Sequence, residues 1–418
     1  MRILRIIARL NVGGPARHVV LQTHNLQDDN FQSWLIAGSV PEGEEGMDYL
    51  ADESGVNPIY IPEMSRELSL KDVTSLFKIY REMKRIRPDI LHTHTAKAGA
   101  VGRAAGLLYR WLTFRTLFGM PRKLKVVHTF HGHVFHSYYG KAKSRFFVGI
   151  ERLMARIATD KIVVISQQQR DEIHNNFRIG KADQFEIIPL GIDLQPFTNT
   201  DSRRSEFRKK IGVNNGEFVV GFVGRITEIK NVPLLLEAAE QLSGNGKSGG
   251  GGFRFVIVGE GNLRSELEKQ VESSGLTTCV SFLGNRNDTE NVYPAMDVVA
   301  LTSLNEGTPL SLIEAMASGK AVISTAVGGV VDLIGAKRVE HEDFDVCERG
   351  IGIRSNSANG FVNGLRYLVE NVELRNEIAA KAREFAMNNF SKDRLVRDTK
   401  QLYLGLMNQN DIGSGDAV

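Results

Sequence analysis

The stretch EGTPLSLIEAMASGKAVISTAVGG, residues Glu306–Gly329, carries the strongest structural signal in this sequence. Thr308 is a favourable N-cap for a helix, and Pro309 suits the first helical position. Gly319 suits the end of that helix, and the apolar run Ala321–Ser324 is typical of a buried strand. The stretch therefore predicts a helix followed by a strand, as in a parallel sheet covered by helices.

Two carboxylates occupy special places in this stretch. Glu306 lies just before the predicted helix, and Glu314 lies inside it among apolar neighbours, where a buried carboxylate needs a polar partner. The free amides of Leu310 and Ser311, together with the helix dipole, favour a bound anion. The sequence therefore predicts a ligand site at the start of this helix.

Two cations precede this stretch. The segment FVGRITEIKN places Arg225 at the end of a predicted strand and Lys230 five residues later. Taken alone they could be ordinary surface charges. Beside a helix N-terminus they suit a diphosphate, since each charge-assisted hydrogen bond contributes about 1.5–3 kcal/mol.

Short apolar runs alternate with amphipathic helical segments over most of the chain. The expected strands are Ile3–Leu10, Phe31–Ala37, Ile59–Ile61, Ile90–Thr93, Lys125–Phe130 and Lys161–Ile165, then Phe218–Val223, Phe253–Val258, Val280–Leu283, Val298–Leu301 and Ala321–Ser324. Two such series predict two Rossmann-like, doubly wound α/β domains that face a cleft. We expect domains at 1–190 and 191–390, a helix at 391–407 that packs back on the first domain, and a disordered tail at 408–418.

Composition excludes several classes of protein. With 42% apolar and 24% charged residues, the 418-residue chain suits a soluble globular protein, and its net charge of +3 argues against a nucleic-acid binder. Cys279 and Cys347 are too few for a disulfide framework or a zinc site, which favours a reducing compartment. The lipophilic stretch Val101–Met120 holds three arginines, so it does not predict a membrane span.

Two glycine turns follow predicted strands, at Gly13-Gly14 and at Val258–Asn262. Neither completes the dinucleotide fingerprint G-x-G-x-x-G, because Arg264 stands where the third glycine belongs. We therefore expect no nicotinamide or flavin cofactor.

Taken in order, these motifs resemble the retaining glycosyltransferases of family 4, which have the GT-B fold. The resemblance spans almost the whole chain. It rests on Gly13-Gly14, on the segments PDILHTH (88–94) and HTFHG (128–132), on FVGR (222–225) with Lys230, on GEG (259–261) and FLG (282–284), and on Glu306-x7-Glu314. The sequence departs from the family pattern after Gly328-Gly329, where Val330-Val331-Asp332 replaces the frequent Pro-Glu.

The resemblance implies a role for each matching residue. The donor diphosphate would be held by Arg225 and Lys230, and the ribose hydroxyls by Glu314. Glu306 would contact the donor sugar, helped by the turn formed by Gly307, Thr308, Leu310 and Ser311. Gly13 and Gly14 would approach the β-phosphate, the nucleotide base would lie near Gly284, and His131 would contact the donor sugar near the reacting centre.

The resemblance further implies a hexosyltransferase that needs neither cofactor nor metal, with UDP as the best-matching nucleotide. The expected acceptor is a glycan or a polyprenyl-diphosphate-linked glycan in cell-surface polysaccharide or O-antigen synthesis, and His94 and Lys97 are candidates to bind it. Zinc ligation by the histidines is disfavoured, because His92, His94, His128, His133 and His136 give no tetrahedral set by spacing.

Three other functions stay open at this point. The first is a sugar-nucleotide epimerase of the same architecture, which would not need the Glu306-x7-Glu314 pair with Arg225 and Lys230. The second is a catalytically inactive nucleotide-sugar sensor. The third is a soluble transferase that makes a small glycoside or a storage glucan.

A basic, aromatic stretch suggests a further partner. Between Gly99 and Lys161, twelve basic residues are opposed only by Glu151 and Asp160. On one continuous helix, Leu107, Trp111, Phe114 and Phe118 would share a face flanked by Arg103 and Arg110. Such a surface suits an anionic membrane, although the same stripe could pack into the core. We expect a cytoplasmic protein, peripheral on the inner face of the plasma membrane.

Overall fold

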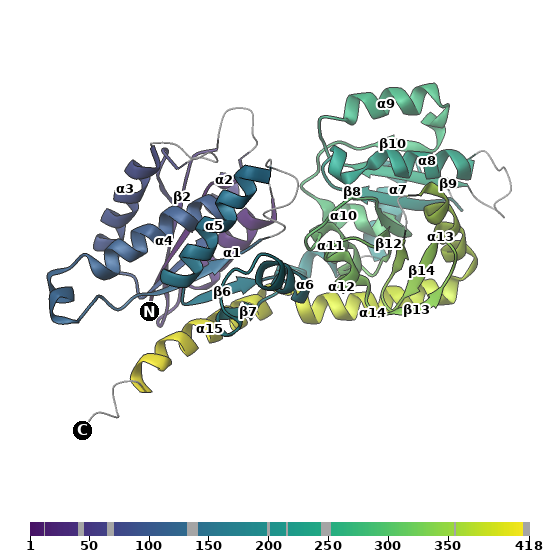
Figure 1. Ribbon diagram of the computed structural model, residues 1–418. Helices are drawn as coiled ribbons and strands as arrows, with labels where there is room; N and C mark the ends of the chain where they lie inside the picture. The colour runs from purple at the N-terminus through teal and green to yellow at the C-terminus, as the bar shows by residue number, and fades with distance from the viewer. Residues whose placement is uncertain are drawn as a thin grey trace. The chain divides into compact units, whose positions relative to one another are not determined.

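The computed structural model describes residues 1–11, 13–40, 46–64, 71–131, 141–198, 201–214, 216–243, 252–354 and 357–412. The chain divides into two compact units (Figure 1). Unit 1 comprises Met1–Ile192 together with Lys392–Val418, and unit 2 comprises Asp193–Ser391. Each is an α/β unit with its own sheet, so the two-domain architecture expected from the sequence is confirmed.

Unit 1 contains a parallel sheet of seven strands in the order β3-β2-β1-β4-β5-β6-β7. The strands are β1 (Arg2–Ile7), β2 (Gln32–Ala37), β3 (Ile59–Tyr60), β4 (Ile90–His94), β5 (Lys125–Thr129), β6 (Lys161–Val164) and β7 (Phe185–Ile187). The main helices are α1 (Gly14–Asn25), α2 (Asp48–Glu53), α3 (Lys71–Ile86), α4 (Ala96–Trp111), α5 (Lys141–Ile157), α6 (Gln167–Asp171) and α15 (Lys392–Ile412).

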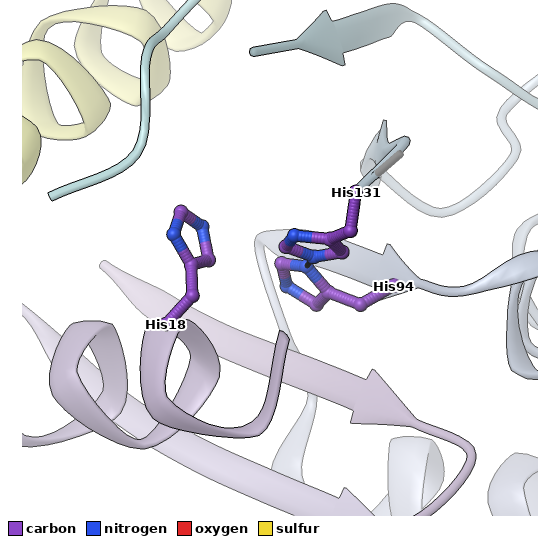
Figure 2. Close-up of side chains that lie close together, drawn as sticks. All are labelled: His18, His94 and His131. Carbon is purple, nitrogen blue, oxygen red and sulfur yellow. Dashed lines mark hydrogen bonds between the residues drawn. The ribbon is translucent and has the colours of Figure 1, made fainter. Parts of the chain in front are cut away.

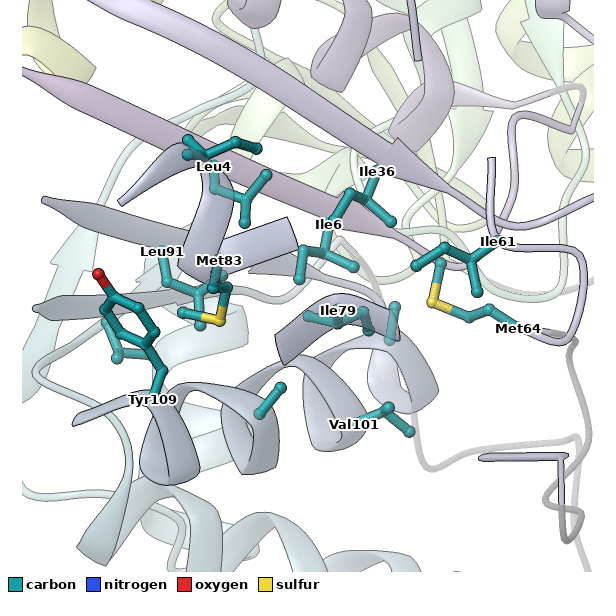
Figure 3. Close-up of a cluster of buried hydrophobic side chains, with 14 of the residues drawn as sticks. Leu4, Ile6, Ile36, Ile61, Met64, Ile79, Met83, Leu91, Val101 and Tyr109 are labelled. Carbon is teal, nitrogen blue, oxygen red and sulfur yellow. The ribbon is translucent and has the colours of Figure 1, made fainter. Parts of the chain in front are cut away.

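Alternate residues of the same strand serve different faces of this sheet. Leu4 and Ile6 of β1 join a buried cluster with Ile79 of α3 and Tyr109 of α4 (Figure 3). Ile3 joins another cluster whose members include Leu395, Tyr403 and Leu406 of α15. Both faces are therefore covered, as a parallel sheet requires.

Unit 2 contains eight strands in the order β10-β9-β8-β11-β12-β15-β14-β13. They are β8 (Phe218–Val223), β9 (Phe253–Val258), β10 (Val280–Phe282), β11 (Val298–Leu301), β12 (Ala321–Thr325), β13 (Lys337–Glu340), β14 (Phe344–Cys347) and β15 (Ile351–Ile353). Its helices are α7 (Asp201–Lys210), α8 (Val232–Ser243), α9 (Arg264–Ser273), α10 (Thr289–Val292), α11 (Leu310–Ala317), α12 (Val330–Ile334), α13 (Ala358–Glu370) and α14 (Val372–Phe390).

One edge of this sheet was not expected from the sequence. Strand β14 pairs antiparallel with both β13 and β15, so the sheet is mixed rather than wholly parallel. All four residues of β13 are exposed, and β15 has only three residues. Neither offers the long apolar run that marks a buried parallel strand, which explains why the pattern missed them.

The helix predicted after Glu306 forms, but it starts later than expected. Helix α11 begins at Leu310 with Pro309, not Thr308, at the N-cap, and no side chain caps it. The backbone of Pro309 is extended, with ψ of 115°, so the helix cannot include it. At the other end, Gly319 adopts φ of +68°, and its N–H and that of Lys320 bond back to Met316 and Ala315.

The C-terminal helix also differs in length from the sequence expectation. Helix α15 continues to Ile412, five residues past the expected end at Met407, and residues 413–418 lie outside the described part. Its packing is that of a core element, because Tyr403 and Leu406 are buried in unit 1.

A buried ion pair in unit 1 generates a stability prediction. The Arg103 guanidinium of α4 donates to both carboxylate oxygens of Glu151 on α5, at 2.7 and 2.6 Å, and both side chains are almost fully buried. Glu151→Ala leaves the guanidinium buried without its charge partner, so we expect a loss of about 3–5 kcal/mol in the stability of unit 1.

The control is Glu82→Ala, which removes the i,i+3 pair with the largely exposed Arg85 and should cost less than about 1 kcal/mol. Both tryptophans, Trp34 and Trp111, lie in unit 1, so urea unfolding followed by tryptophan fluorescence reports on this unit. Equal midpoints for the two variants would contradict the prediction.

Candidate functional site

The strand order of unit 2 reverses between β8 and β11. From β8 the chain proceeds to β9 on one side, whereas β11 and β12 lie on the other. Loops that leave the carboxyl ends of two such strands diverge, and ligands bind in open parallel sheets at this point. Arg225 and Lys230 follow β8, and Glu306 follows β11, so three predicted site residues flank the switch point.

Lys230 and Glu306 contact each other across this point. The ammonium of Lys230 pairs with Oε1 of Glu306, and the hydroxyl of Ser303 donates to the same oxygen at 2.5 Å. The Thr302 hydroxyl donates to the backbone carbonyl of Lys230 at 2.8 Å, which ties the two loops together. Arg225, five residues before Lys230, is exposed. The pair therefore presents one cation and one anion, both partly accessible, at the carboxyl edge of the sheet.

Two glycines hold the Glu306 loop in place. Gly328 follows β12 with φ of +51°, and a Cβ there would lie 1.9 Å from the carbonyl oxygen of Glu306. A Cβ on Gly329 would lie 2.1 Å from the carbonyl oxygen of Gly307, and its N–H donates to Glu306 at 3.2 Å. Only glycine permits this close backbone approach. The sequence pattern contains both glycines but does not predict this backbone contact.

Glu314 has the polar partner that its burial requires. It lies in α11 with 7% of its surface exposed, and the Tyr293 hydroxyl donates to its Oε2 at 2.9 Å. Tyr293 comes from the 3-10 turn Tyr293–Ala295 and is fully buried. The sequence does not indicate this role of Tyr293, since a tyrosine in a short apolar segment is usually a plain core residue.

The two remaining glycine motifs of unit 2 lie at the same edge. Gly284, with φ of +71°, accepts a hydrogen bond at 2.8 Å from the N–H of Gly259, so the ends of β9 and β10 are joined there. A Cβ on Gly259 would lie 1.9 Å from the carbonyl oxygen of Gly224, next to Arg225. These glycines therefore shape the loops around the cations.

Unit 1 has its own switch point, between β1 and β4. Gly13 and Gly14 come after β1 and open α1, His94 is the last residue of β4, and His131 follows β5. Nδ1 of His94 lies 2.9 Å from Nε2 of His131. Burial lowers the pKa of His131 to about 4 and that of His94 well below its usual value, so both rings are neutral at pH 7.

Lys97 has a partly buried carboxylate partner. Its ammonium lies 2.8 Å from the Asp72 carboxylate of α3, and only 7% of the residue is exposed. Its charge is therefore balanced within unit 1.

The structure shows the hydrogen-bond partners of two further histidines. His92 bonds to Tyr403 and Thr129, at 2.6 and 2.7 Å, and His128 bonds to Thr93 at 2.9 Å. His133 and His136 lie outside the described residues.

The chain has two Rossmann-like units, and one of them carries cations, a carboxylate and close-packed glycines at its switch point. This arrangement is that of an enzyme of the GT-B class. Comparison with known proteins then gives the family. Residues 12–196 match Glycosyltransferase Family 4, and residues 203–385 match Glycosyl transferases group 1. The chain belongs to glycosyltransferase family 4 and is a glycosyltransferase.

Individual relatives agree with this placement. An Escherichia coli UDP-Gal:α-D-GlcNAc-diphosphoundecaprenol α-1,3-galactosyltransferase is 30% identical over 362 residues, which cover 86% of each chain. An α-monoglucosyldiacylglycerol synthase of Acholeplasma laidlawii is 25% identical, over 79% of each. Among solved structures, Anabaena HepE in complex with UDP and glucose superposes with a TM-score of 0.76, at 21% identity over 96% of this chain and 99% of that one, which shows the shared fold.

The close approach of Gly328 to the Glu306 carbonyl gives a stability prediction. Gly328→Ala places a methyl group against the Glu306 carbonyl, whereas Gly212→Ala, also at positive φ (+66°), meets no atom within 4 Å. The left-handed backbone should lower the stability of both variants by about 1–2 kcal/mol. The steric contact should lower the stability of Gly328→Ala by roughly 1–3 kcal/mol more. Calorimetric unfolding of the two variants measures the difference, and equal melting temperatures would show that the Glu306 loop does not depend on Gly328.

Proposed function

We propose that this glycosyltransferase moves a hexose from a UDP-sugar to a polyprenyl-diphosphate-linked glycan, with retention of anomeric configuration and without a metal ion. The name of the Escherichia coli relative supports both substrates, since that enzyme uses UDP-Gal and an undecaprenol-linked acceptor. The proposed product belongs to cell-surface polysaccharide synthesis, of the O-antigen type.

The observation that carries the proposal is the Lys230–Glu306 pair at the switch point of unit 2. A diphosphate that arrives there meets the ammonium of Lys230, the exposed guanidinium of Arg225 and the amide end of α11. These groups neutralise the negative charge that develops on the leaving nucleoside diphosphate, which is the task that a divalent cation performs elsewhere.

The position of each side chain supports the proposed donor roles. Glu314, buried and oriented by Tyr293, accepts hydrogen bonds from the ribose hydroxyls. As Lys230 turns to the phosphates, the Glu306 carboxylate is released to accept from sugar hydroxyls. Gly307, Thr308, Leu310 and Ser311 form the turn that approaches the donor, and Gly284 borders the base.

In unit 1, we assign Gly13 and Gly14 to the donor phosphate and His131 to the donor sugar. His94 supports His131 through the hydrogen bond between the two rings and remains a candidate for acceptor contact. Lys97 can serve the acceptor only if it leaves Asp72.

We propose that the anomeric configuration is retained by front-face attack, without an enzymic nucleophile. The acceptor hydroxyl forms a new bond to the anomeric carbon on the side from which the diphosphate departs. The bond between the anomeric carbon and the phosphate oxygen breaks, the electron pair leaves with the diphosphate, and a phosphate oxygen takes the hydroxyl proton.

The first test removes single donor contacts. Glu314→Ala and Arg225→Ala should each lower turnover by about 10²–10³-fold, because each removes one preorganised electrostatic contact. Glu240→Ala, an exposed residue on α8, is the matched control and should keep wild-type turnover. Turnover is measured as release of free UDP in the presence of acceptor, with circular dichroism to confirm folding. Near-wild-type turnover in either site variant would reject this donor site.

The second test addresses stereochemistry and metal use together. In buffer that contains a chelator, the product made from an α-linked UDP-sugar should carry an α-glycosidic linkage, identified by the coupling constant of its anomeric proton in NMR. A β-linked product would contradict retention. Loss of turnover on chelation, restored by added divalent metal, would contradict the metal-free transfer.

We also propose that unit 1 binds an anionic bilayer, because a polyprenyl-linked acceptor resides there. The expected continuous helix is wrong: α4 ends at Trp111 and a separate 3-10 turn follows at Phe114–Phe118. Arg103 does not flank an exposed face, since it is buried against Glu151, and Arg110 pairs with Asp160.

The aromatic residues nevertheless lie outside the core. The 111–120 segment exposes 52–77% of its largest apolar side chains, which are Trp111, Leu112, Phe114, Leu117, Phe118 and Met120. Arg115 and Lys123 are exposed beside them. No helix in the described part of the chain is long and apolar enough to cross a membrane. An apolar segment with flanking cations suits the headgroup boundary of an anionic leaflet.

Vesicle co-sedimentation tests this surface. The wild-type chain should bind vesicles that contain phosphatidylglycerol more strongly than phosphatidylcholine vesicles, since each cation near the surface contributes about 1 kcal/mol. Replacing Trp111, Phe114 and Phe118 together by serine should abolish binding. Phe77→Ser on α3, where Phe77 is 60% exposed, is the control. Equal binding to both vesicle types, or unchanged binding by the triple variant, would end this proposal.

A further inference from the structure

Three histidines converge in unit 1, beside its switch point. His18 projects from α1, His94 ends β4 and His131 follows β5 (Figure 2). One ring nitrogen of each lies within 4.8 Å of those of the other two. The rings of His94 and His131 stack with centroids 5.1 Å apart, and that of His18 meets His131 edge-on at 4.9 Å.

These rings have free nitrogens in a buried place. His18 and His94 are 4% and 0% exposed, and His131 is partly buried. Within the described residues, Nδ1 of His18, Nε2 of His94 and Nδ1 of His131 have no hydrogen-bond partner. Buried polar atoms without partners are uncommon in folded proteins and call for a ligand or an ordered water.

We propose that His18, His94 and His131 form a binding site for one zinc-like divalent ion, with a water molecule at the fourth position. Three imidazoles and an open position are a common zinc environment. Zinc–nitrogen bonds of about 2.0–2.1 Å place tetrahedral ligand nitrogens about 3.3 Å apart. One ring nitrogen of each histidine lies within 4.8 Å of those of the other two, so the three rings must move closer together to ligate one ion.

The ligand atoms determine which ions can bind. The cluster consists of three imidazoles and contains no carboxylate. A hard cation such as Mg²⁺ or Ca²⁺ needs oxygen ligands and gains nothing here. Zn²⁺, Co²⁺ and Ni²⁺ bind imidazole nitrogen well, and ionisation of the fourth-position water supplies the missing negative charge.

Such an ion would inhibit transfer rather than support it. His131 is the residue that we assign to the donor sugar, and an ion on its ring nitrogen would hold that ring away from the sugar. The metal site itself does not depend on the proposed function, because ion binding can be measured without any substrate.

The experiment is a titration of the tag-free full-length chain with Co²⁺, followed by visible absorption, and with Zn²⁺, followed by calorimetry. We expect one ion per chain and the intense absorption of four-coordinate Co²⁺. His18→Ala, His94→Ala and His131→Ala should each weaken binding by about tenfold or more, the effect that even loss of an outer-shell partner can produce. Mg²⁺ should not compete. In transfer assays, Zn²⁺ should lower wild-type turnover, and each variant should lose this sensitivity relative to its own metal-free rate.

The matched control is His24→Ala, an exposed histidine on the same helix as His18, which should leave ion affinity unchanged. Because Ala variants of buried residues can unfold, His18→Asn is tested in parallel with circular dichroism as the folding check. Absence of saturable binding to the wild-type chain overturns the proposal. So does unchanged affinity in folded variants of the three histidines, or equal loss in His24→Ala.

Discussion

All strands of a parallel sheet end at the same edge, and this constraint places nearly every candidate residue of the chain. In unit 2 the loops after β8, β9, β10, β11 and β12 share that edge, so motifs separated by a hundred residues meet there. In unit 1 the same constraint brings together the start of α1 and the ends of β4 and β5. The fold positions the chemistry, because helices on both faces leave the carboxyl edge open.

The Lys230–Glu306 pair is the point where fold and function connect. Each side chain neutralises the other, so neither charge is left uncompensated in a partly buried place. In the proposed mechanism, a bound diphosphate would offer Lys230 a stronger partner and would free the carboxylate of Glu306. Gly328 and Gly329 hold the Glu306 backbone close behind, so the carboxylate is presented by a tightly packed loop.

The sequence predicted most of the sheet strands and the Glu306-x7-Glu314 helix because long apolar runs and glycine ends are local signals. It missed β13–β15, which are short or exposed, and Pro309 as the N-cap, where backbone conformation outweighed side-chain preference. The sequence pattern predicts Arg103 to be a surface cation, but a partner 48 residues away, Glu151, pairs with it in a buried place. The sequence does not indicate a role for His18, because only the fold brings it to His94 and His131.

Hydrogen–deuterium exchange of the full chain, with and without a UDP-hexose, tests the central claim most directly. If the switch point of unit 2 holds the donor, backbone amides in 224–231, 303–314 and 328–331 should exchange more slowly with the donor present. The same segments should show little change with a sugar that lacks the nucleotide diphosphate. Saturating donor without slower exchange in these three segments would contradict the account.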